Sequence, residues 1–290
     1  MQKKIALIGA NGQLGQYLLS CLNQLDVDVI GLSRKELDLT NSEKIQKKLT
    51  NIKPDIIINT SAYTAVDKAE SEPELAHQIN CVAPAQMAAY AEQAGIVFIH
   101  FSTDYVFAGD AKVAYRETDA TNPQGEYGSS KLSGEQAVLD SGAQAFIFRT
   151  AWVYSQQGSN FYKTMLKLAE SRSELNVVDD QFGSPTYAAA IAQATTDIVQ
   201  KLLTNKRFAT GVYHMTCEGQ TNWAEFAKEI FKLNEKSVAV QGIPSSDYPT
   251  PAKRPSFSVL DNQQLKGVFG ISLPDWREAL EACVQEDRDK

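Results

Sequence analysis

Short apolar runs alternate with amphipathic stretches along the first half of the chain. The apolar runs are KIALIG at 4–9, VDVIGLS at 27–33, PDIIINTSA at 54–62, IVFIHFST at 96–103 and QAFIFRTAWVY at 144–154. Runs of this kind are typical of strands that are buried on both faces of a parallel sheet. Leucines at helical spacing between 13 and 23, and the stretches 42–52, 72–94 and 127–140, predict the connecting helices. The stretch 72–94 is expected to be a helix pair, interrupted near Pro84 and closed by Gly95.

Strands that alternate with helices predict an α/β fold. We expect a Rossmann-type, doubly wound parallel sheet with right-handed crossovers and helices on both faces. The pattern is less regular after residue 155, where helices are expected at 160–171, at 187–203 and from Asn222 onward. Residues 1–150 are therefore expected to form the main domain. Residues 151–290 would mainly form a smaller α/β lobe, with some elements returning to the main sheet.

Composition and charge narrow the class of protein. The 290 residues are 43% hydrophobic and the formal net charge is -7, so a basic surface for nucleic acid is not expected. Four scattered cysteines form no CxxC pair, which predicts reduced thiols rather than disulfides or a zinc site. The apolar run at the N-terminus is too short for a signal peptide or a membrane span. These features predict a cytoplasmic protein that does not act at a membrane.

The turn after the first predicted strand carries three glycines. GANGQLG places Gly9, Gly12 and Gly15 in a shifted relative of the GxGxxG dinucleotide fingerprint. Gly9 would allow the tight turn, Gly12 the approach of a pyrophosphate and Gly15 the close packing of helix on strand. The helix N-terminus would then offer free N–H groups to the anion. An ordinary strand–helix turn is the alternative, but the position in the first βαβ unit favours a dinucleotide site.

Residues at the ends of the following strands are expected to complete this site. An acid at the end of the second strand binds the ribose of NAD, whereas an arginine accommodates the 2′-phosphate of NADP. Ser33 and Arg34 occupy that turn here and Glu36 comes later, which favours NADPH and leaves NADH as the alternative. The expected cofactor-binding residues are Gly9, Asn11, Gly12, Gln13, Leu14, Gly15, Ser33, Arg34, Asp38, Leu39, Ala62, Tyr63, Thr64, Ser102, Tyr127 and Lys131.

Tyr127 and Lys131, in YGSSK, lie four residues apart on a predicted helix and share one of its faces. A lysine ammonium favours a nearby phenolate, so it would lower the pKa of the tyrosine from its ordinary value of about 10. Such a tyrosine can donate a proton to a carbonyl oxygen while hydride reaches the carbon. The spacing alone is common on solvated helix faces. Ser102 and Thr103, however, supply hydroxyls after the fourth strand, at the sheet edge that holds the ligand crevice.

The motifs GANGQLG, STDYVF and YGSSK, in this order, resemble the extended short-chain dehydrogenase/reductase superfamily. The second half narrows the resemblance. FRTAWVY, NFYKTML, DDQFGSPT, YPTPAKRP and LPDW, with NTSAYTAVDKAESEPELAHQIN at 59–80, are similar to the dTDP-4-dehydrorhamnose reductase family nearly end to end. The resemblance implies reduction of the 4-keto group of dTDP-4-dehydro-6-deoxy-L-mannose with NAD(P)H. The product would be dTDP-L-rhamnose, in the last step of dTDP-rhamnose biosynthesis for polysaccharides.

The resemblance also implies roles for single residues. Thr103, Tyr127 and Lys131 would be catalytic, with Tyr127 as the proton donor. The residues expected to contact the nucleotide-sugar substrate are Thr103, Asp104, Tyr127, Trp152 and Arg254. Arg254 would bind the diphosphate, because guanidinium suits bidentate phosphate recognition. Without the resemblance, Trp152 is expected in the core, and a surface charge stays the alternative for Arg254.

One departure from the family concerns metal and assembly. Some members form a magnesium-linked dimer through carboxylates on the first helix and after the FGxPT motif. This chain has Tyr17 and Ala189 at the matching positions, and neither is a carboxylate ligand. We therefore expect no metal and doubt Mg²⁺, while a homodimer stays open. The three histidines are far apart in the sequence, and His100 is expected to be a satisfied core residue.

Two other functions stay open on this scaffold. The first is an epimerase or dehydratase that acts on a nucleotide sugar. A dehydratase would need a pair of carboxyl groups, and STDYVF offers Asp104 but no adjacent glutamate. The second is a non-catalytic binding protein, since relatives of the family include a regulatory subunit of methionine adenosyltransferase. The complete Thr/Tyr/Lys set argues against this function.

Overall fold

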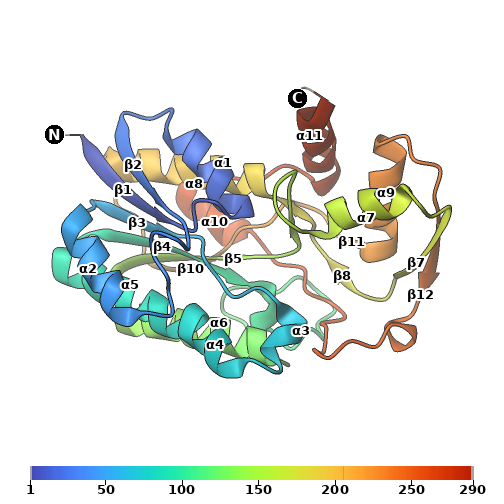
Figure 1. The fold of residues 1–290 in the computed structure, drawn as a ribbon, viewed down its shortest axis with the longest axis horizontal. Helices are drawn as coiled ribbons and strands as arrows, with labels where there is room; N and C mark the ends of the chain where they lie inside the picture. Colours follow the sequence, from blue (N-terminus) through green and yellow to red (C-terminus); the bar gives the residue numbers. More distant parts are fainter. Residues whose placement is uncertain (1, 205, 289–290) are drawn as a thin grey trace.

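A computed structural model describes residues 2–204 and 206–288 (Figure 1). Its centre is a six-stranded sheet with the order β10-β5-β4-β3-β1-β2, in which every neighbouring pair is parallel. The strands are β1 (Lys3–Ile8), β2 (Val27–Leu32), β3 (Ile56–Asn59), β4 (Val97–Thr103), β5 (Gln144–Thr150) and β10 (Gly211–His214). The predicted Rossmann-type α/β fold is confirmed.

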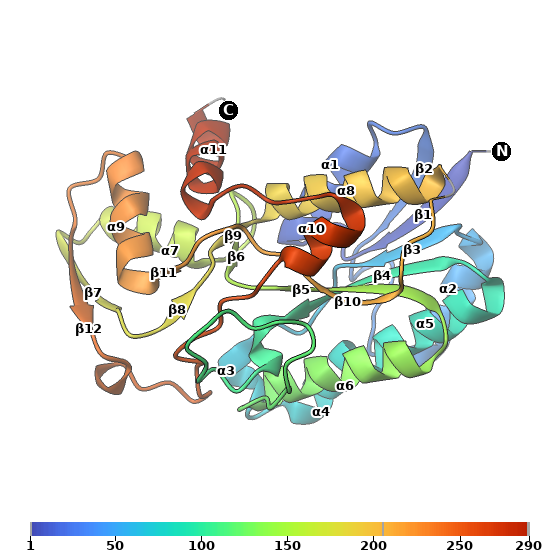
Figure 2. The ribbon, with the colours of Figure 1, turned by 180° about the vertical axis from the view of Figure 1, so that it is seen from behind.

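Helices cover both faces of this sheet (Figures 1 and 2). One face packs against α1 (Gln13–Leu22), α8 (Ala188–Leu203) and α10 (Gln263–Phe269), and the other against α2 (Ser42–Ile52), α5 (Ala83–Ala94) and α6 (Glu126–Asp140). Side chains of β1 alternate between the two cores, with Ile5 and Leu7 in the first and Ala6 and Ile8 in the second. Burial on both faces explains why this strand is a continuous apolar run.

The position of β1 decides where a ligand can bind. It lies between β2 and β3, so the chain changes its direction across the sheet after β2. The loops that follow β1 and β3 therefore leave the sheet toward opposite faces. In sheets of this type a ligand crevice forms at that point, beyond the carboxyl ends of the strands.

The remaining elements lie mostly beyond this carboxyl edge (Figure 1). They are α7 (Phe161–Ala169), α9 (Trp223–Leu233), α11 (Trp276–Arg288) and three strand pairs. The pairs are β6 (Val153–Tyr154) with β9 (Thr186–Tyr187), β7 (Glu174–Val178) with β12 (Ala239–Ile243), and β8 (Phe182–Gly183) with β11 (Thr221–Asn222). β10, α8 and α10 come from the second half of the chain but pack in the layers of the main sheet. The domain boundary at residue 150 stays a prediction.

Three segments differ from the predicted elements. The run 144–154 is not one strand, because Trp152 has a left-handed φ of 48° that ends the extended backbone between β5 and β6. The stretch 72–94 contains α4 (Pro73–His77), a π-helical turn (Gln78–Val82) and α5, so the interruption precedes Pro84. Pro84 is tolerated because it lies in the first turn of α5. In the run 54–62, only β3 is extended in the sheet.

Candidate active site

A cavity of about 760 Å³ lies at the carboxyl edge of the main sheet. The segments after β1, β2, β3, β4 and β5 form its wall, together with side chains of α6, α7 and α9. The predicted site residues in this wall are Gly9, Asn11, Gly12, Gln13, Leu14, Arg34, Asp38, Leu39, Ala62, Thr64, Ser102, Thr103, Asp104, Tyr127, Lys131, Trp152 and Arg254. Gly15, Ser33 and Tyr63 are outside it. The fold thus brings most of the predicted residues into one space.

The glycine turn after β1 has the shape that the motif predicts. Gly9 has a φ of +83°, and a Cβ there would lie 2.6 Å from the Ser61 hydroxyl. A Cβ on Gly15 would lie 2.0 Å from the Gly9 carbonyl oxygen, so Gly15 serves the packing of α1 and not the cavity wall. No side chain caps the N-terminus of α1, whose N–H groups and dipole are therefore available to an anion. This cradle fits the pyrophosphate of a dinucleotide.

The turn after β2 presents the Arg34 guanidinium and the Asp38 carboxylate to the cavity, whereas Glu36 is outside the wall. Arg34 lines the cavity. Ser33 does not, because its backbone N–H (2.8 Å) and its hydroxyl both donate to the carboxylate of Glu36. These hydrogen bonds hold the pKa of Glu36 below its ordinary value. Glu36 therefore folds back to the strand end, although it comes later in the sequence.

Tyr63 stabilises the segment after β3 instead of lining the cavity. Its hydroxyl donates to the Glu72 carboxylate (2.5 Å), and its backbone N–H donates to the side-chain oxygen of Asn80 (2.8 Å). These two contacts direct Tyr63 away from the cavity. Its neighbours Ala62 and Thr64 form the wall in its place.

Thr103, at the end of β4, and Tyr127, in the first turn of α6, meet in the cavity. The Thr103 hydroxyl donates to Asp104 Oδ1 (3.0 Å), and its hydrogen bonding to Tyr127 favours the phenolate. Burial outweighs this effect and raises the pKa of Tyr127 above its ordinary value of 10. The expectation that the Tyr127 pKa lies below its ordinary value is therefore wrong for this arrangement, and Tyr127 keeps its proton at neutral pH. Burial also raises the pKa of Asp104 to about 6.

Lys131 lies at the base of the cavity with 1% of its surface exposed. Its Nζ donates to the carbonyl oxygen of Phe101 (2.6 Å) and lies 3.3 Å from His100 Nε2. Burial lowers the pKa of Lys131 to about 8, although Glu135 on the same helix acts in the opposite direction. His100 is buried and has partners, as predicted for a core residue, but one partner is this lysine.

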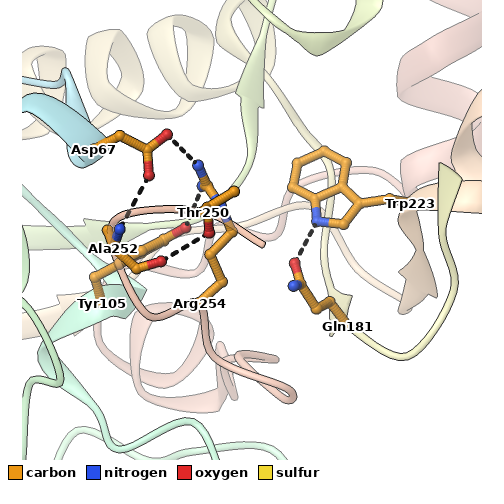
Figure 3. Close-up of polar contacts among 7 residues, drawn as sticks. All are labelled: Asp67, Tyr105, Gln181, Trp223, Thr250, Ala252 and Arg254. Atoms are coloured by element: carbon orange, nitrogen blue, oxygen red, sulfur yellow. Dashed lines mark hydrogen bonds and ion pairs between the residues drawn. The ribbon is translucent and has the colours of Figure 1, made fainter. Parts of the chain in front are cut away.

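Trp152 belongs to the cavity wall and not to the core. Its indole stacks on Trp223 of α9, with ring centroids 3.5 Å apart and planes 6° from parallel. Trp223 in turn donates its indole N–H to Gln181 (3.2 Å; Figure 3). A Cβ on Gly183 would lie 2.5 Å from the Trp152 ring, so only glycine fits behind it. A left-handed backbone at a non-glycine residue costs about 1–3 kcal/mol, and these contacts keep Trp152 in that conformation.

Arg254 reaches the cavity wall from the proline-rich stretch and is held there (Figure 3). Its guanidinium donates to the Asp67 carboxylate (2.8 Å) and to the Tyr105 hydroxyl (3.3 Å). The second Asp67 oxygen accepts the backbone N–H of Ala252 (3.2 Å), so Asp67 fixes both the side chain and its loop. The loop is also braced by the Thr250 hydroxyl, which donates to the Ala252 carbonyl (2.9 Å). Arg254 is therefore not an isolated surface charge.

A second cavity of about 890 Å³ adjoins the first. The two share Phe161, Trp223 and Arg254 in their walls. The rest of the second wall comes mainly from α7 and β7, with Gln241 of β12 and the exposed Tyr248. Each cavity has the volume of an ordinary ligand site, so the pair can hold two ligands side by side.

Comparison with known proteins identifies the family. The family model described as RmlD substrate binding domain matches residues 3–288. A curated dTDP-4-dehydrorhamnose reductase from Burkholderia thailandensis is 44% identical over 294 residues, which cover 98% of this chain and 98% of that protein. The chain belongs to the dTDP-4-dehydrorhamnose reductase family.

Solved structures of dTDP-4-dehydrorhamnose reductases share this fold over the whole chain. The protein from Clostridium acetobutylicum has a TM-score of 0.92 and 40% sequence identity, and the match covers 98% of this chain and 99% of that chain. The protein from Bacillus anthracis, solved in complex with NADP, has a TM-score of 0.91 and 38% identity, with coverage of 99% and 100%. The resemblance found in the motifs is therefore confirmed at the level of family and fold.

Within this reductase fold, some site residues were missed by the sequence reasoning. Asp67 comes from the short helix α3 (Val66–Ala69), Tyr105 from a 3₁₀ turn (Asp104–Val106) and Trp223 from the start of α9. Tyr105 could have been found, since it lies within the STDYVF motif. Asp67 also lies within a stretch that carries the resemblance, residues 59–80, but nothing there singles it out. Trp223 has no such signal, because only long-range contacts bring it to the cavity.

The described part of this reductase family member holds no metal cluster and no membrane-spanning helix. Within residues 2–204 and 206–288, no group of three or more His, Cys, Asp and Glu side chains could hold a metal ion. Tyr17 donates its hydroxyl to Glu286 of α11 (2.5 Å). In the same part of the chain, every helix is too short or too polar to cross a bilayer.

Proposed function

We propose that this chain reduces the 4-keto group of dTDP-4-dehydro-6-deoxy-L-mannose with NADPH to give dTDP-L-rhamnose. The observation that carries the proposal is the meeting of Thr103, Tyr127 and Lys131 with the glycine turn in one cavity. Family membership supports the substrate, because the curated relatives are named dTDP-4-dehydrorhamnose reductase. The protein would act in the cytoplasm, and a homodimer is compatible with this function.

The cofactor half of the cavity fits a nicotinamide dinucleotide. The Gly9 cradle and the uncapped N-terminus of α1 would hold the pyrophosphate, and Arg34 would select the 2′-phosphate. NADPH, when bound, supplies the hydride for the carbonyl carbon. The NADP complex of the Bacillus anthracis relative supports this choice, and NADH is a weaker alternative because Glu36 lies at the same turn. We propose no role for Mg²⁺.

Side chains of this protein would supply the proton, orient the carbonyl oxygen that accepts it and stabilise the tyrosinate that remains. Tyr127 is a phenol at neutral pH, so it can donate its proton to the carbonyl oxygen of the sugar. The Thr103 hydroxyl lies beside it and can orient the same oxygen. Lys131, one turn along α6, would stabilise the tyrosinate that remains, since an ammonium favours a nearby phenolate.

The substrate would extend from the first cavity into the second. Trp152 and Asp104 would contact the sugar, and Arg254, fixed by Asp67, would meet the diphosphate. The second cavity shares Arg254 with the first and would hold the nucleoside. No glutamate is among the wall residues of the first cavity in the described chain, which argues against a sugar dehydratase.

The experiment is to supply the 4-keto sugar nucleotide with NADPH and to follow absorbance at the nicotinamide band. Tyr127→Phe should lower kcat by roughly 10²–10⁴-fold, the usual contribution of a positioned proton donor, and should leave NADPH binding nearly unchanged. Tyr90→Phe is the matched control, because Tyr90 lies on α5 and donates to Leu49 away from the cavity.

The possible outcomes separate the three candidate functions. Oxidation of NADPH by wild type and by Tyr90→Phe, but not by Tyr127→Phe, supports the reductase. Conversion of the sugar without net loss of NADPH would indicate an epimerase. Binding of NADPH with no turnover of any kind would indicate a binding protein, and full activity of Tyr127→Phe would remove the tyrosine from its role.

A further inference from the structure

A chain of buried polar groups runs beneath the cavity from β3 to Lys131. Asn59, the last residue of β3, lies opposite His100 of β4, and both are 0% exposed. Asn59 Nδ2 lies 3.2 Å from His100 Nδ1, and His100 Nε2 lies 3.3 Å from Lys131 Nζ. His100 thus connects the end of a neighbouring strand to the lysine of the site.

The direction of each hydrogen bond between Asn59, His100 and Lys131 follows from the donor and acceptor atoms. The side-chain oxygen of Asn59 accepts the backbone N–H of Ser61 (3.0 Å), so its amide nitrogen faces the imidazole. An amide nitrogen can only donate, so His100 Nδ1 must be the acceptor and carry no proton. A neutral ring then holds its proton on Nε2, the nitrogen that lies next to Lys131.

The His100 ring is neutral in this environment. Burial and the charge of Lys131 lower the pKa of His100 well below its ordinary value of 6.5, and they outweigh the Asn59 backbone, which acts in the opposite direction. An Nε2–H next to an ammonium would place two donors against each other, because an ammonium has no lone pair. A neutral amine can accept this N–H and still donate to the Phe101 carbonyl (2.6 Å).

Other titratable groups surround Lys131 on its own helix and on the strands. Glu135 favours the ammonium, but its carboxylate is paired with Arg149 of β5 (2.7 Å). Tyr127, one turn before Lys131, is protonated at neutral pH. Asp104, at the end of β4, acts on Tyr127 and accepts the Thr103 hydroxyl. His100 is therefore the titratable side chain in direct contact with the Lys131 nitrogen among the described residues.

We propose that Asn59 and His100 are positioning residues that present an N–H donor to Lys131 and thereby set the pH at which this lysine loses its proton. The consequence for turnover rests on the function proposed above. The ammonium is the form that stabilises the tyrosinate left by proton donation, so reduction slows as Lys131 deprotonates. The buried pair thus sets the upper pH limit of the reaction.

The titration of Lys131 can be measured in the whole protein without cofactor or substrate. In protein labelled with ¹³C at the lysine Cε, the Lys131 signal is the one missing from Lys131→Met, and its chemical shift is followed against pH. His100→Gln should move the midpoint up by about one pH unit, because its amide oxygen can accept from the ammonium in place of an opposed donor. The basic limb of the kcat profile should move by the same amount.

Asn59→Asp is a second, independent test. Its carboxylate accepts a hydrogen bond from His100 Nδ1–H, so the neutral ring keeps its proton on Nδ1 and Nε2 can accept from the ammonium. The midpoint should therefore again rise. His214→Gln is the matched control, since His214 is another buried histidine whose side chain does not contact Lys131. In this variant the midpoint of the Lys131 titration should equal that of wild type. If one test variant does not fold, the other decides.

Equal midpoints in wild type, His100→Gln, Asn59→Asp and the control would overturn the proposal. So would a wild-type Lys131 that does not titrate until pH 10, the range of an ordinary lysine. Failure of the keto-sugar assay would instead refute the proposed function, because the titration uses neither ligand. The two failures are therefore distinguishable.

Discussion

Replacing Asp104 with asparagine should stabilise the protein at neutral pH while it weakens the site. Asp104 is 2% exposed, and burial raises the pKa of its carboxyl from 3.8 to about 6. The folded state thus binds the proton more tightly than the unfolded state does. Between pH 4 and pH 6 the carboxyl is protonated when folded and ionised when unfolded, so stability falls as pH rises through this range. Above pH 6 the full loss of folding stability is present.

The size of this loss follows from the two pKa values. A shift from 3.8 to about 6 corresponds to about 3 kcal/mol, at about 1.4 kcal/mol per unit. Asparagine has nearly the same shape and keeps an oxygen for the Thr103 hydroxyl (3.0 Å), but it carries no charge. The free energy of unfolding of Asp104→Asn, relative to wild type, should therefore rise by about 3 kcal/mol between pH 4 and pH 8.

Urea unfolding followed by tryptophan fluorescence at both pH values measures this difference. Comparing two pH values removes any constant effect of the substitution on packing. Asp28→Asn, at an exposed position of β2, is the control and should show no such change. A pH-independent difference between Asp104→Asn and wild type would refute the reasoning. A variant that gains stability but keeps full turnover would contradict the proposed contact of Asp104 with the sugar.

Three further predictions concern the walls of the cavity. Arg34→Ala should raise the KM for NADPH roughly tenfold, because one charge-assisted hydrogen bond is lost, and should leave the KM for NADH nearly unchanged. Equal effects on both cofactors in steady-state kinetics would contradict the assignment. Asp67→Asn removes the charge that holds Arg254, so the KM for the sugar nucleotide should change several-fold with little effect on the KM for NADPH, and an unchanged substrate KM would count against this anchor. Gly15→Ala places a Cβ 2.0 Å from the Gly9 carbonyl oxygen. It should weaken NADPH binding, measured by nicotinamide fluorescence, by more than tenfold or lower Tm by several degrees. Wild-type values for both would show that α1 can move away.

The fold was predictable because its signals are local. The apolar runs mark strands buried on both faces, and β1 confirms this with side chains in both cores. Gly9 and Gly15 have a steric reason that a sequence motif can carry. The spacing of Tyr127 and Lys131 also places them on one face of α6 without any tertiary information. These features depend on backbone geometry within one βα unit or one helix.

The electrostatic state of the site was not predictable in the same way. The spacing of Tyr127 and Lys131 favours a lowered tyrosine pKa, but burial in the folded protein raises it. The effect of burial depends on how much of the chain surrounds the phenol, and that is a property of the assembled layers. The same burial lowers the pKa of Lys131 to about 8, whereas an exposed YxxxK pair would leave the lysine near its ordinary value.

The sequence by itself determined the order of strands and helices, the dinucleotide turn and the Tyr127–Lys131 pair. Each of these follows from the spacing of residues that are close together in the sequence. Only the tertiary structure decided which distant side chains complete the site. Arg254 meets Asp67 across 187 positions, and Trp152 stacks on Trp223 of another helix. His100 reaches Lys131 across 31 positions. Such contacts depend on how the layers of the fold pack together, and this packing cannot be inferred from the local periodicity of the sequence.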